Sequence, residues 1–179
     1  MADQVVADRS SSAGPPAIGA HLGRGMISSV SPTHDIRSAT AADVGSLREV
    51  YRRSSMSNEG DRELFAVHPE LLDWSDLAVQ EGRTRVAVAG GRVVGFATLS
   101  FSDGSAEVED LFVDPDWERQ GVGRALIEDL TELARGAGYT CIEVDANPHA
   151  LKFYGSVGFF GLGEAVVPYG TGLRMRRVV

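Results

Sequence analysis

The sequence predicts an α/β fold in which a mixed, mostly antiparallel sheet of six or seven strands carries helices on both faces. Two observations predict it. Three strand-like segments follow one another between residues 84 and 113, joined by glycine-containing tight turns, which is typical of an antiparallel meander. A helical segment then separates the last of these strands from a strand at 140–146, and such a crossover makes the two strands parallel.

The chain has 179 residues, enough for one domain with a hydrophobic core. We expect residues 1–33, which are rich in Ser, Gly, Ala and Pro, to form a flexible N-terminal extension, and residues 34–179 to form a single domain. No basic start followed by an apolar stretch marks a secretory signal, and no apolar run reaches the ~18 residues of a membrane span. A cytoplasmic protein with no membrane partner is therefore expected.

The formal net charge is −8, which argues against a nucleic-acid partner, because such surfaces need clustered Lys and Arg. The charge suits a cationic substrate, although solubility alone explains it equally well. Cys141 is the only cysteine, which excludes an internal disulfide and a multi-cysteine metal cluster. His68 and His149 show no metal-ligand spacing, so no metal is expected.

The first half of the domain is predicted to hold a short strand at 34–37 and then a helix capped by Thr40 or Asp43. The helix is indicated by apolar residues at three- and four-residue steps, namely Val44, Leu47, Val50 and Tyr51. A second, less regular helical stretch is expected over 61–80, with an interruption at His68-Pro69.

The second half opens with strands at 84–89, 93–101 and 106–113, of which the first two are joined by the turn Gly90-Gly91. A helix over 121–135 is indicated by an apolar stripe of Val122, Leu126, Leu130, Leu133 and Ala137. The remaining predicted elements are a strand at 140–146, a short helix at 148–157 and two strands at 160–167 and 173–179.

The turn into the second long helix is the most informative segment. A strand ends at Pro115, and the helix begins within the pair Gly121-Val122-Gly123. Early helix N–H groups lack an intrahelical partner, and glycines let an anion approach the backbone, which suits a diphosphate. A dinucleotide fingerprint would need glycine where Leu126 stands, and a phosphate loop would need Gly-Lys, which the chain lacks. Taken alone, the glycine pair also fits a tight turn onto a closely packed helix.

Two segments together resemble the GNAT superfamily of N-acetyltransferases. Residues 111–126 resemble that family's strand, Val-x-Pro and Gly-x-Gly helix start, and residues 144–159 resemble its strand, Asn, short helix, Phe-Tyr and Gly-Phe. The resemblance implies a GNAT-like sheet with a splayed parallel strand pair, acetyl-CoA as co-substrate, and a homodimer. One departure is Glu118, which stands where the family often has Arg or Gln; we expect it to turn outward.

The resemblance also implies which residues bind the cofactor. Tyr154 would protonate the departing thiolate of coenzyme A, and Asn147 would bond the pantetheine arm, although the two residues also suit a packing role and a strand-end cap. The implied cofactor-binding set is Leu111, Phe112, Val113, Arg119, Gln120, Gly121, Val122, Gly123, Arg124, Asn147 and Tyr154.

An amine acceptor needs a base, because an alkylammonium has a pKa near ~10. Candidates are Glu107, Glu109 and Asp110, which follow one another on the strand at 106–113. Strict alternation puts Glu107 and Glu109 on one face and Asp110 on the other unless a bulge intervenes. By resemblance to diamine-acetylating members, Glu109 is the first candidate and Glu107 the second. The same acids equally suit a solvated strand end.

The sequence thus predicts an enzyme that transfers an acetyl group from acetyl-CoA to a primary amine of a small molecule by direct attack in a ternary complex. An acetyl-enzyme on Cys141 is disfavoured, because no His pattern activates that thiol. Two alternatives are a non-catalytic acetyl-CoA-binding sensor or scaffold, and an acetyltransferase for protein N-termini or lysines. The identity of the amine is left open among polyamine, antibiotic, amino acid and protein.

Overall fold

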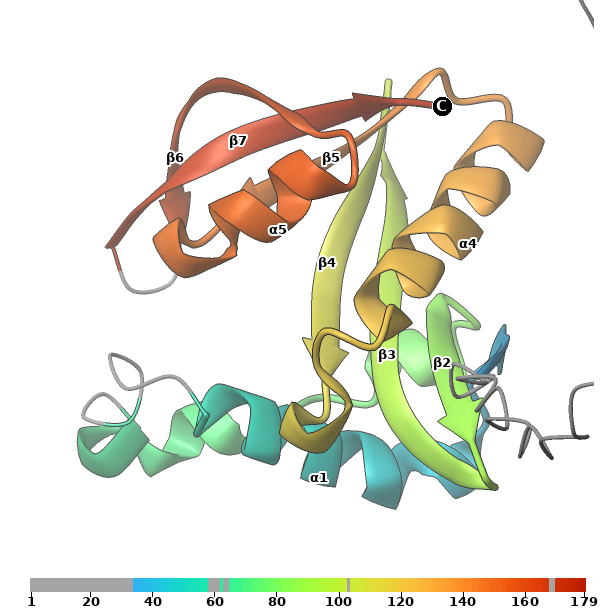
Figure 1. The fold of residues 1–179 in the computed structure, drawn as a ribbon, viewed down its shortest axis with the longest axis vertical. Helices are drawn as coiled ribbons and strands as arrows, with labels where there is room; N and C mark the ends of the chain where they lie inside the picture. The colour runs from blue at the N-terminus through green and yellow to red at the C-terminus, as the bar shows by residue number, and fades with distance from the viewer. Residues whose placement is uncertain (1–33, 58–61, 63–64, 103, 168–169) are drawn as a thin grey trace, which may run out of the picture.

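Seven strands form one mixed sheet in the described part of the chain, in the order β1-β2-β3-β4-β5-β7-β6 (Figure 1). The computed structural model describes residues 34–57, 62, 65–102, 104–167 and 170–179. Among the described strands, β4 and β5 are the one parallel pair. The predicted fold class is therefore confirmed. The strands are β1 (Asp35–Ser38), β2 (Thr84–Ala89), β3 (Arg92–Ser102), β4 (Ser105–Val113), β5 (Cys141–Ala146), β6 (Phe160–Val167) and β7 (Gly170–Val178).

The meander of β2, β3 and β4 forms because its turns can adopt the conformation that hairpins need. Gly90 and Gly91 have φ of 56° and 77°, the left-handed region required at both central positions of a two-residue hairpin turn. Along β3, successive side chains enter opposite layers: Phe96 packs in one hydrophobic cluster and Ala97 in the other. The sheet is thus buried on both faces at its centre.

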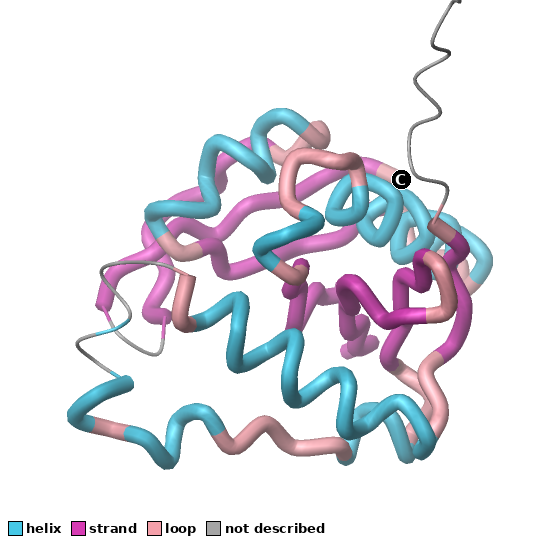
Figure 2. Tube along the Cα trace, turned by 60° about the horizontal axis from the view of Figure 1, so that its bottom comes forward, coloured by secondary structure: helices cyan, strands magenta, loops and turns pink. Residues whose placement is uncertain are grey.

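Helices cover the two faces. Helix α1 (Val44–Ser55) lies across one face, where Leu47 and Val50 pack against Phe96, and Figure 2 shows α1 crossing the strands. Helix α4 (Val122–Gly136) and the short α5 (Leu151–Ser156) cover the other face. The predicted apolar stripe of α4 is buried at Val122, Leu126 and Leu130. It is wrong at its end, where Leu133 and Ala137 are exposed and Ile127 and Ala134 fill the core instead. None of the described helices has the length and apolar content that crossing a bilayer requires.

Both candidate caps contribute to the start of α1. Thr40 precedes a 3-10 turn (Ala41–Asp43) that leads into the helix, and its N–H and hydroxyl both donate to Asp43 Oδ2 over 2.8 Å. Arg37 of β1 binds the same carboxylate through two hydrogen bonds of 2.8 Å. The hydrogen bonds from Arg37 hold the pKa of Asp43 well below its usual range. A short strand and a helix are thereby joined by one buried carboxylate.

The stretch predicted as an irregular helix over 61–80 is divided into short pieces where it is described. Residues 65–67 are helical, a 3-10 turn covers Pro69–Leu72, and α3 covers only Leu77–Gln80. Pro69 supplies no backbone N–H, which ends the helix before it. The helix predicted at 148–157 likewise divides into a 3-10 turn (Pro148–Ala150) followed by α5. The proposed extension 1–33 lies outside the described residues, so the domain division stays a prediction.

Strands β4 and β5 diverge after a short contact. Their parallel pairing covers two positions, Ala106 with Ile142 and Glu107 with Glu143, and Figure 1 shows the strands splaying apart beyond them. From there β5 pairs on its other side with β7. The C-terminal halves of β4 and β5 therefore leave a wedge between two parts of one sheet.

Candidate active site

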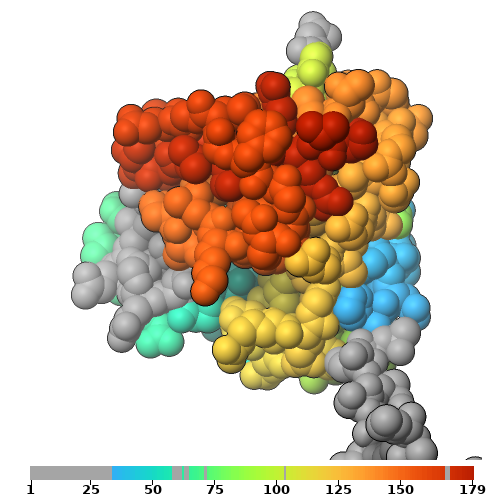
Figure 3. All heavy atoms as spheres, turned by 45° about the horizontal axis from the view of Figure 1, so that its top comes forward, coloured from blue at the N-terminus to red at the C-terminus, as the bar shows by residue number. Residues whose placement is uncertain are grey.

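Two cavities occupy the wedge between the diverging strands. Their volumes are about 350 and 360 Å³, and five residues line both: Ser54, Leu111, His149, Ala150 and Tyr154. Figure 3 shows the surface hollowed between the yellow segment that follows β4 and the orange segment that follows β5. We call the cavity that includes Asp110 the inner cavity, and the one that includes Gly123 the outer cavity.

The start of α4 borders the outer cavity. Gly121 caps the helix with a φ of 87°, and the first backbone hydrogen bond of the helix runs from Ala125 N to Gly121 O at 3.0 Å. Among the described residues, no carbonyl accepts a hydrogen bond from the N–H groups of 121–124. Together with the helix dipole, these unpaired donors form a site suited to an anion.

The two glycines of this turn are needed for different reasons. Gly121 has open space around it, so the left-handed conformation rather than crowding requires glycine there. At Gly123 a Cβ atom would lie 3.2 Å from the Phe153 ring, so this glycine allows α4 to pack against α5. At Gly123, close packing is thus a reason for glycine in addition to the approach of an anion to the backbone.

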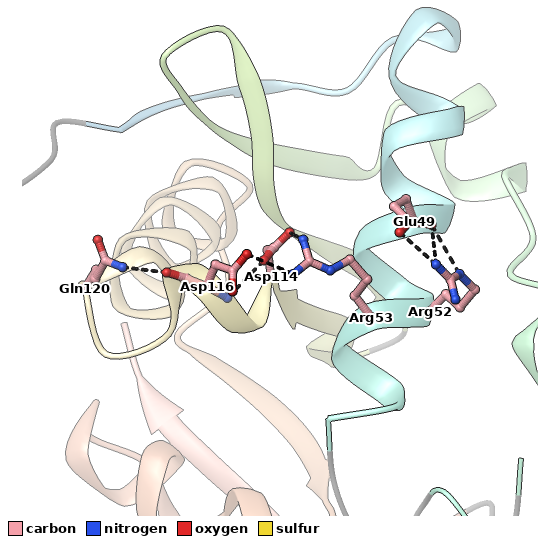
Figure 4. A network of polar contacts seen from close by, with 6 residues as sticks. All are labelled: Glu49, Arg52, Arg53, Asp114, Asp116 and Gln120. Atoms are coloured by element: carbon pink, nitrogen blue, oxygen red, sulfur yellow. Dashed lines mark hydrogen bonds and ion pairs between the residues drawn. The ribbon is translucent and has the colours of Figure 1, made fainter.

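The loop before α4 is fastened to α1 by a polar network (Figure 4). Arg53 donates from Nη1 to Asp114 at 2.6 Å and from Nη2 to Asp116 at 2.9 Å. Asp114 also accepts from the backbone N–H of Asp116, and the Gln120 side chain donates to the Asp116 carbonyl at 2.8 Å. Four residues from two distant segments therefore fix the approach to the anion site.

Tyr154 lies where the two cavities meet. It is 7% exposed on α5, and its ring packs edge-on against Phe153 and Phe159, each with a centroid distance of 5.2 Å. Burial, together with the negative charge of Asp110, raises the pKa of the Tyr154 phenol. A phenol with a raised pKa is protonated at neutral pH, which is the form able to donate a proton.

A bulge in β4 decides where the acidic side chains point. Thr98 of β3 pairs with Asp110, but its neighbour Leu99 pairs with Val108, so Glu109 is the extra residue without a partner on β3. Ser100 pairs with Glu107, and residues two apart on β3 share a face. Glu107 and Asp110 therefore share a face, because the bulge named as the exception to strict alternation is present at Glu109.

The bulge brings Asp110 to the inner cavity. Its carboxylate accepts a hydrogen bond from Trp74 Nε1 at 3.4 Å and another from the Thr98 side chain. Burial raises the pKa of Asp110 by more than these hydrogen bonds lower it. Asp110 therefore holds a proton more tightly than an ordinary aspartate does, and a general base is most effective when its pKa approaches the operating pH.

The family model for acetyltransferases of the GNAT family matches residues 45–159. The chain belongs to the GNAT family. Among solved structures, it is similar to a GCN5-related N-acetyltransferase from Rhodopseudomonas palustris (TM-score 0.69, 22% identity, 82% of this chain and 96% of that one). It is also similar to the PaiA N-acetyltransferase of Thermoplasma acidophilum in complex with coenzyme A (TM-score 0.65, 18% identity, 82% and 99%). These likenesses show the GNAT fold.

The relatives of this GNAT chain are named for several different acetyl acceptors. It is 34% identical over 127 residues to serotonin N-acetyltransferase 2, chloroplastic, of Oryza sativa, covering 69% of this chain and 59% of that protein. It is 38% identical over 76 residues to glucosamine 6-phosphate N-acetyltransferase of Trypanosoma brucei, and 39% identical over 82 residues to N-alpha-acetyltransferase RimI of Mycobacterium tuberculosis. The last two alignments cover 38% and 43% of this chain. The chain spans between half and three fifths of the length of these relatives.

The structure brings most of the predicted cofactor-binding residues of this GNAT chain to the cavities. Leu111 and Tyr154 line both; Phe112 and Asn147 line the inner cavity, and Val113, Arg119 and Gly123 line the outer one. The Val122 side chain is buried in the core and lines neither cavity. Arg124 donates to the Ser156 carbonyl at 2.8 Å. Glu118 is exposed as expected, yet it also lines the outer cavity.

The two acids predicted as bases are both paired with arginine. Arg83 binds Glu109 at 2.5 Å, and Glu109 lines the inner cavity. Arg174 binds Glu107 at 2.5 Å, and within the described residues Glu107 lines neither cavity. The structure therefore does not bring Glu107 to the predicted site.

Sequence reasoning ranked Asp110 below Glu109 and Glu107 as a candidate base, and it did not single out Trp74. Asp110 directly follows Glu109 in the sequence, but no glycine or proline there indicates the bulge that turns Asp110 toward the inner cavity. Trp74 stands in a stretch without helical or strand periodicity. As for metals, the described residues contain no group of three or more His, Cys, Asp or Glu side chains placed to hold an ion.

Proposed function

We propose that this chain is an acetyl-CoA-dependent N-acetyltransferase that moves an acetyl group to a primary amine by direct attack in a ternary complex. The observation that carries the proposal is the meeting of two cavities at Tyr154. The outer cavity is bordered by unpaired N–H donors of α4, and the inner cavity holds the buried carboxylate of Asp110. One cavity suits a diphosphate and the other an amine, with a proton donor between them.

The start of α4 supports the cofactor half of the proposal. The N–H groups of residues 120–124 would hold the diphosphate, with Arg119 and Arg124 nearby as exposed cations. The pantetheine arm would lie in the wedge along Leu111 and Val113 and contact Asn147. The N–H groups near Phe112 and Val113 would polarise the acetyl carbonyl. Acetyl-CoA supplies the thioester whose carbonyl carbon is attacked.

The acid–base steps are assigned to Asp110 and Tyr154. An ammonium group enters the inner cavity, and the Asp110 carboxylate takes one of its protons. The neutral nitrogen then attacks the acetyl carbon, so that an N–C bond forms while the C–S bond breaks. The Tyr154 hydroxyl gives its proton to the departing sulfur, and the second proton lost by the nitrogen returns to the phenol through solvent. We place the base at Asp110 rather than Glu109 or Glu107, because arginine binds both of the latter.

Release of the coenzyme A thiol on mixing with acetyl-CoA and a panel of amines tests the proposal. Amine-dependent release is expected, and Tyr154→Phe is expected to lower kcat by ~10²-fold while acetyl-CoA affinity changes little, because the ring packing is kept. Binding of acetyl-CoA without thiol release from any amine would favour a sensor or scaffold. Thiol release only with peptides would favour a protein acetyltransferase, the function that the name of the RimI relative suggests.

We also propose a homodimer that acts in the cytoplasm. Strand β6 is an edge of the sheet and exposes Phe160, Leu162 and Val166, which supports pairing between copies of the chain. Light scattering at micromolar concentration tests the pairing: a monomer mass would contradict it.

A further inference from the structure

We infer that Thr98 and Thr84 are positioning residues for the proposed base: their hydroxyl groups form a chain of hydrogen bonds that ends on the Asp110 carboxylate and holds it at the inner cavity. The inference rests on the proposed function and adds to it two residues that line neither of the two cavities. Three features support it: the register of three strands, the burial of the two hydroxyl groups, and the direction in which their hydrogen bonds must run.

The three residues form one rung across three neighbouring strands. Thr84 of β2 pairs with Thr98 of β3, and Thr98 pairs with Asp110 of β4. Paired residues of adjacent strands point to the same side of the sheet, where their side chains lie close together. The bulge at Glu109 brings Asp110 to this side, because strict alternation along β4 would put Asp110 on the face of Val108 instead.

Both threonines are buried among apolar side chains. Thr84 is 1% exposed and Thr98 is 0% exposed. The next rung on the same side of the sheet packs in the hydrophobic cluster that α1 covers, and it consists of Val86, Phe96 and Phe112. A buried hydroxyl group is unfavourable unless it forms a hydrogen bond, and valine would fill such a place without that requirement. Packing alone therefore does not explain why two threonines stand next to Asp110.

The hydrogen bonds run in one direction when Asp110 is ionised. The hydroxyl oxygens of Thr84 and Thr98 lie 3.1 Å apart, and by geometry either hydroxyl can be the donor. A hydroxyl has one hydrogen to donate, and an ionised carboxylate only accepts. Thr98 therefore donates to Asp110, and Thr84 donates to Thr98. Because each donor polarises the next, the chain supports the negative charge at its cavity end.

Two neutral donors hold the Asp110 carboxylate. Trp74 Nε1 donates to Oδ2 at 3.4 Å, and the Thr98 side chain is the second donor. An ionised carboxylate has about four acceptor positions, so two donors leave positions for the ammonium group of a substrate. Asp110 lines the inner cavity, where that group would enter. The carboxylate is thus oriented before an amine binds.

Other charged groups act on Asp110 as well, and substitution of Thr98 leaves them in place. Burial raises the pKa of Asp110, the hydrogen bonds from Thr98 and Trp74 lower it, and the charges of Glu109 and Arg83 raise and lower it respectively. Among the described residues that line the inner cavity, the other titratable ones are Tyr51, Asp145, His149 and Tyr154. Removing the Thr98 hydroxyl should therefore raise the pKa of Asp110 further.

The test compares Thr98→Val with Thr98→Ser by the pH profile of kcat/KM, using the amine with the fastest thiol release in the original protein. Valine keeps the packing and loses the donor, whereas serine keeps the donor and loses a methyl group. We expect the acid limb, the rise of kcat/KM with pH, to move up by about one pH unit in Thr98→Val and by less than half as much in Thr98→Ser. A role in packing alone predicts unmoved limbs and the greater loss of stability in Thr98→Ser.

Thr84→Val tests the far end of the chain. It leaves the contact between Thr98 and Asp110 in place but removes the hydroxyl that donates to Thr98. The acid limb is expected to move in the same direction as in Thr98→Val, by a smaller amount. A limb that stays in place in either valine variant would overturn the inference for the residue replaced.

A second measurement separates this inference from the proposed function. The carbon NMR signal of the Asp110 carboxyl group, assigned by its loss in Asp110→Asn, is titrated without acetyl-CoA or amine. Its midpoint is expected to rise in Thr98→Val and not in Thr98→Ser. An unmoved midpoint in Thr98→Val would overturn the inference while leaving the transferase function intact. A raised midpoint, with no amine-dependent thiol release from the original protein, would overturn the proposed function instead.

Discussion

Arg53 and Asp114 are joined by a 2.6 Å hydrogen bond between α1 and the loop that leads to α4, across 61 positions of the sequence. Asp114 is 3% exposed, so this is a largely buried charge pair on which the shape of the loop depends. Because Ser54 and Ser55, the neighbours of Arg53, line the inner cavity, one helix turn contacts both halves of the proposed site.

Replacing Arg53 tests whether this pair positions the diphosphate site. Arg53→Met leaves the buried Asp114 without its cationic partner, which we expect to lower the melting temperature and to weaken acetyl-CoA binding several-fold. Arg53→Lys should recover part of the affinity. The matched control is Arg52→Met, because Arg52 binds Glu49 at the surface, with both side chains more than half exposed. Calorimetric titration that found the same affinity in Arg53→Met and Arg52→Met would refute the positioning role.

The pH dependence of turnover tests Asp110 as the base. Burial raises the pKa of Asp110, so the carboxylate is available only above that raised value. The acid limb of kcat/KM is therefore expected at higher pH than the ~4 of an ordinary aspartate, with activity rising as pH rises through it. Asp110→Asn should lower kcat/KM by ~10²-fold or more and remove that limb. An unchanged acid limb in Asp110→Asn would assign the limb to another group.

The raised pKa of Asp110 also predicts how the stability of the protein changes with pH: activity should rise with pH, whereas the free energy of unfolding should fall. A raised pKa means that the folded state binds the proton more tightly than the unfolded state, so the free energy of unfolding falls as pH rises through the raised pKa. Asp110→Asn lacks this fall. The melting temperature of the variant relative to the original protein should therefore increase between pH 4 and pH 8, and a constant difference would contradict the burial argument.

Gly123 offers a test of the packing between α4 and α5. A Cβ there would lie 3.2 Å from Phe153, which neighbours Tyr154, so Gly123→Ala should displace the start of α4. We expect a destabilisation of ~1–3 kcal/mol and weaker acetyl-CoA binding. Gly136→Ala in the last turn of the same helix is the control, because its Cβ would meet nothing within 4 Å. Equal melting temperatures for the two variants would show that the contact relaxes without cost.

Much of this fold was predictable because its signals are local. The Gly90-Gly91 turn, the apolar stripe of α4 and the crossover that makes β4 and β5 parallel all depend on residues close in sequence. The segments that carry the GNAT resemblance are equally local, and the family model covers them. Local patterns thus predicted the sheet, and they led to the cofactor site that we propose.

The acceptor side was less predictable because its geometry depends on distant partners. The bulge at Glu109 arises from how β4 pairs with β3, and no residue of Glu107-Val108-Glu109-Asp110 requires it. Arg83, which binds Glu109, lies 26 positions from it in the sequence, and Arg174, which binds Glu107, lies 67 positions from it. Trp74 reaches Asp110 over 36 positions. Side-chain identity was visible in the sequence, but the pairing of these charges was not.

The most direct test of the account is calorimetric titration of the protein with acetyl-CoA and, separately, with S-acetylpantetheine, which has the same thioester but no diphosphate. The account places the diphosphate on the N–H groups at the start of α4. It therefore predicts that acetyl-CoA binds and that S-acetylpantetheine binds at least tenfold more weakly, a difference of about 1.4 kcal/mol or more. Equal affinities for the two compounds, or no binding of acetyl-CoA, would contradict it.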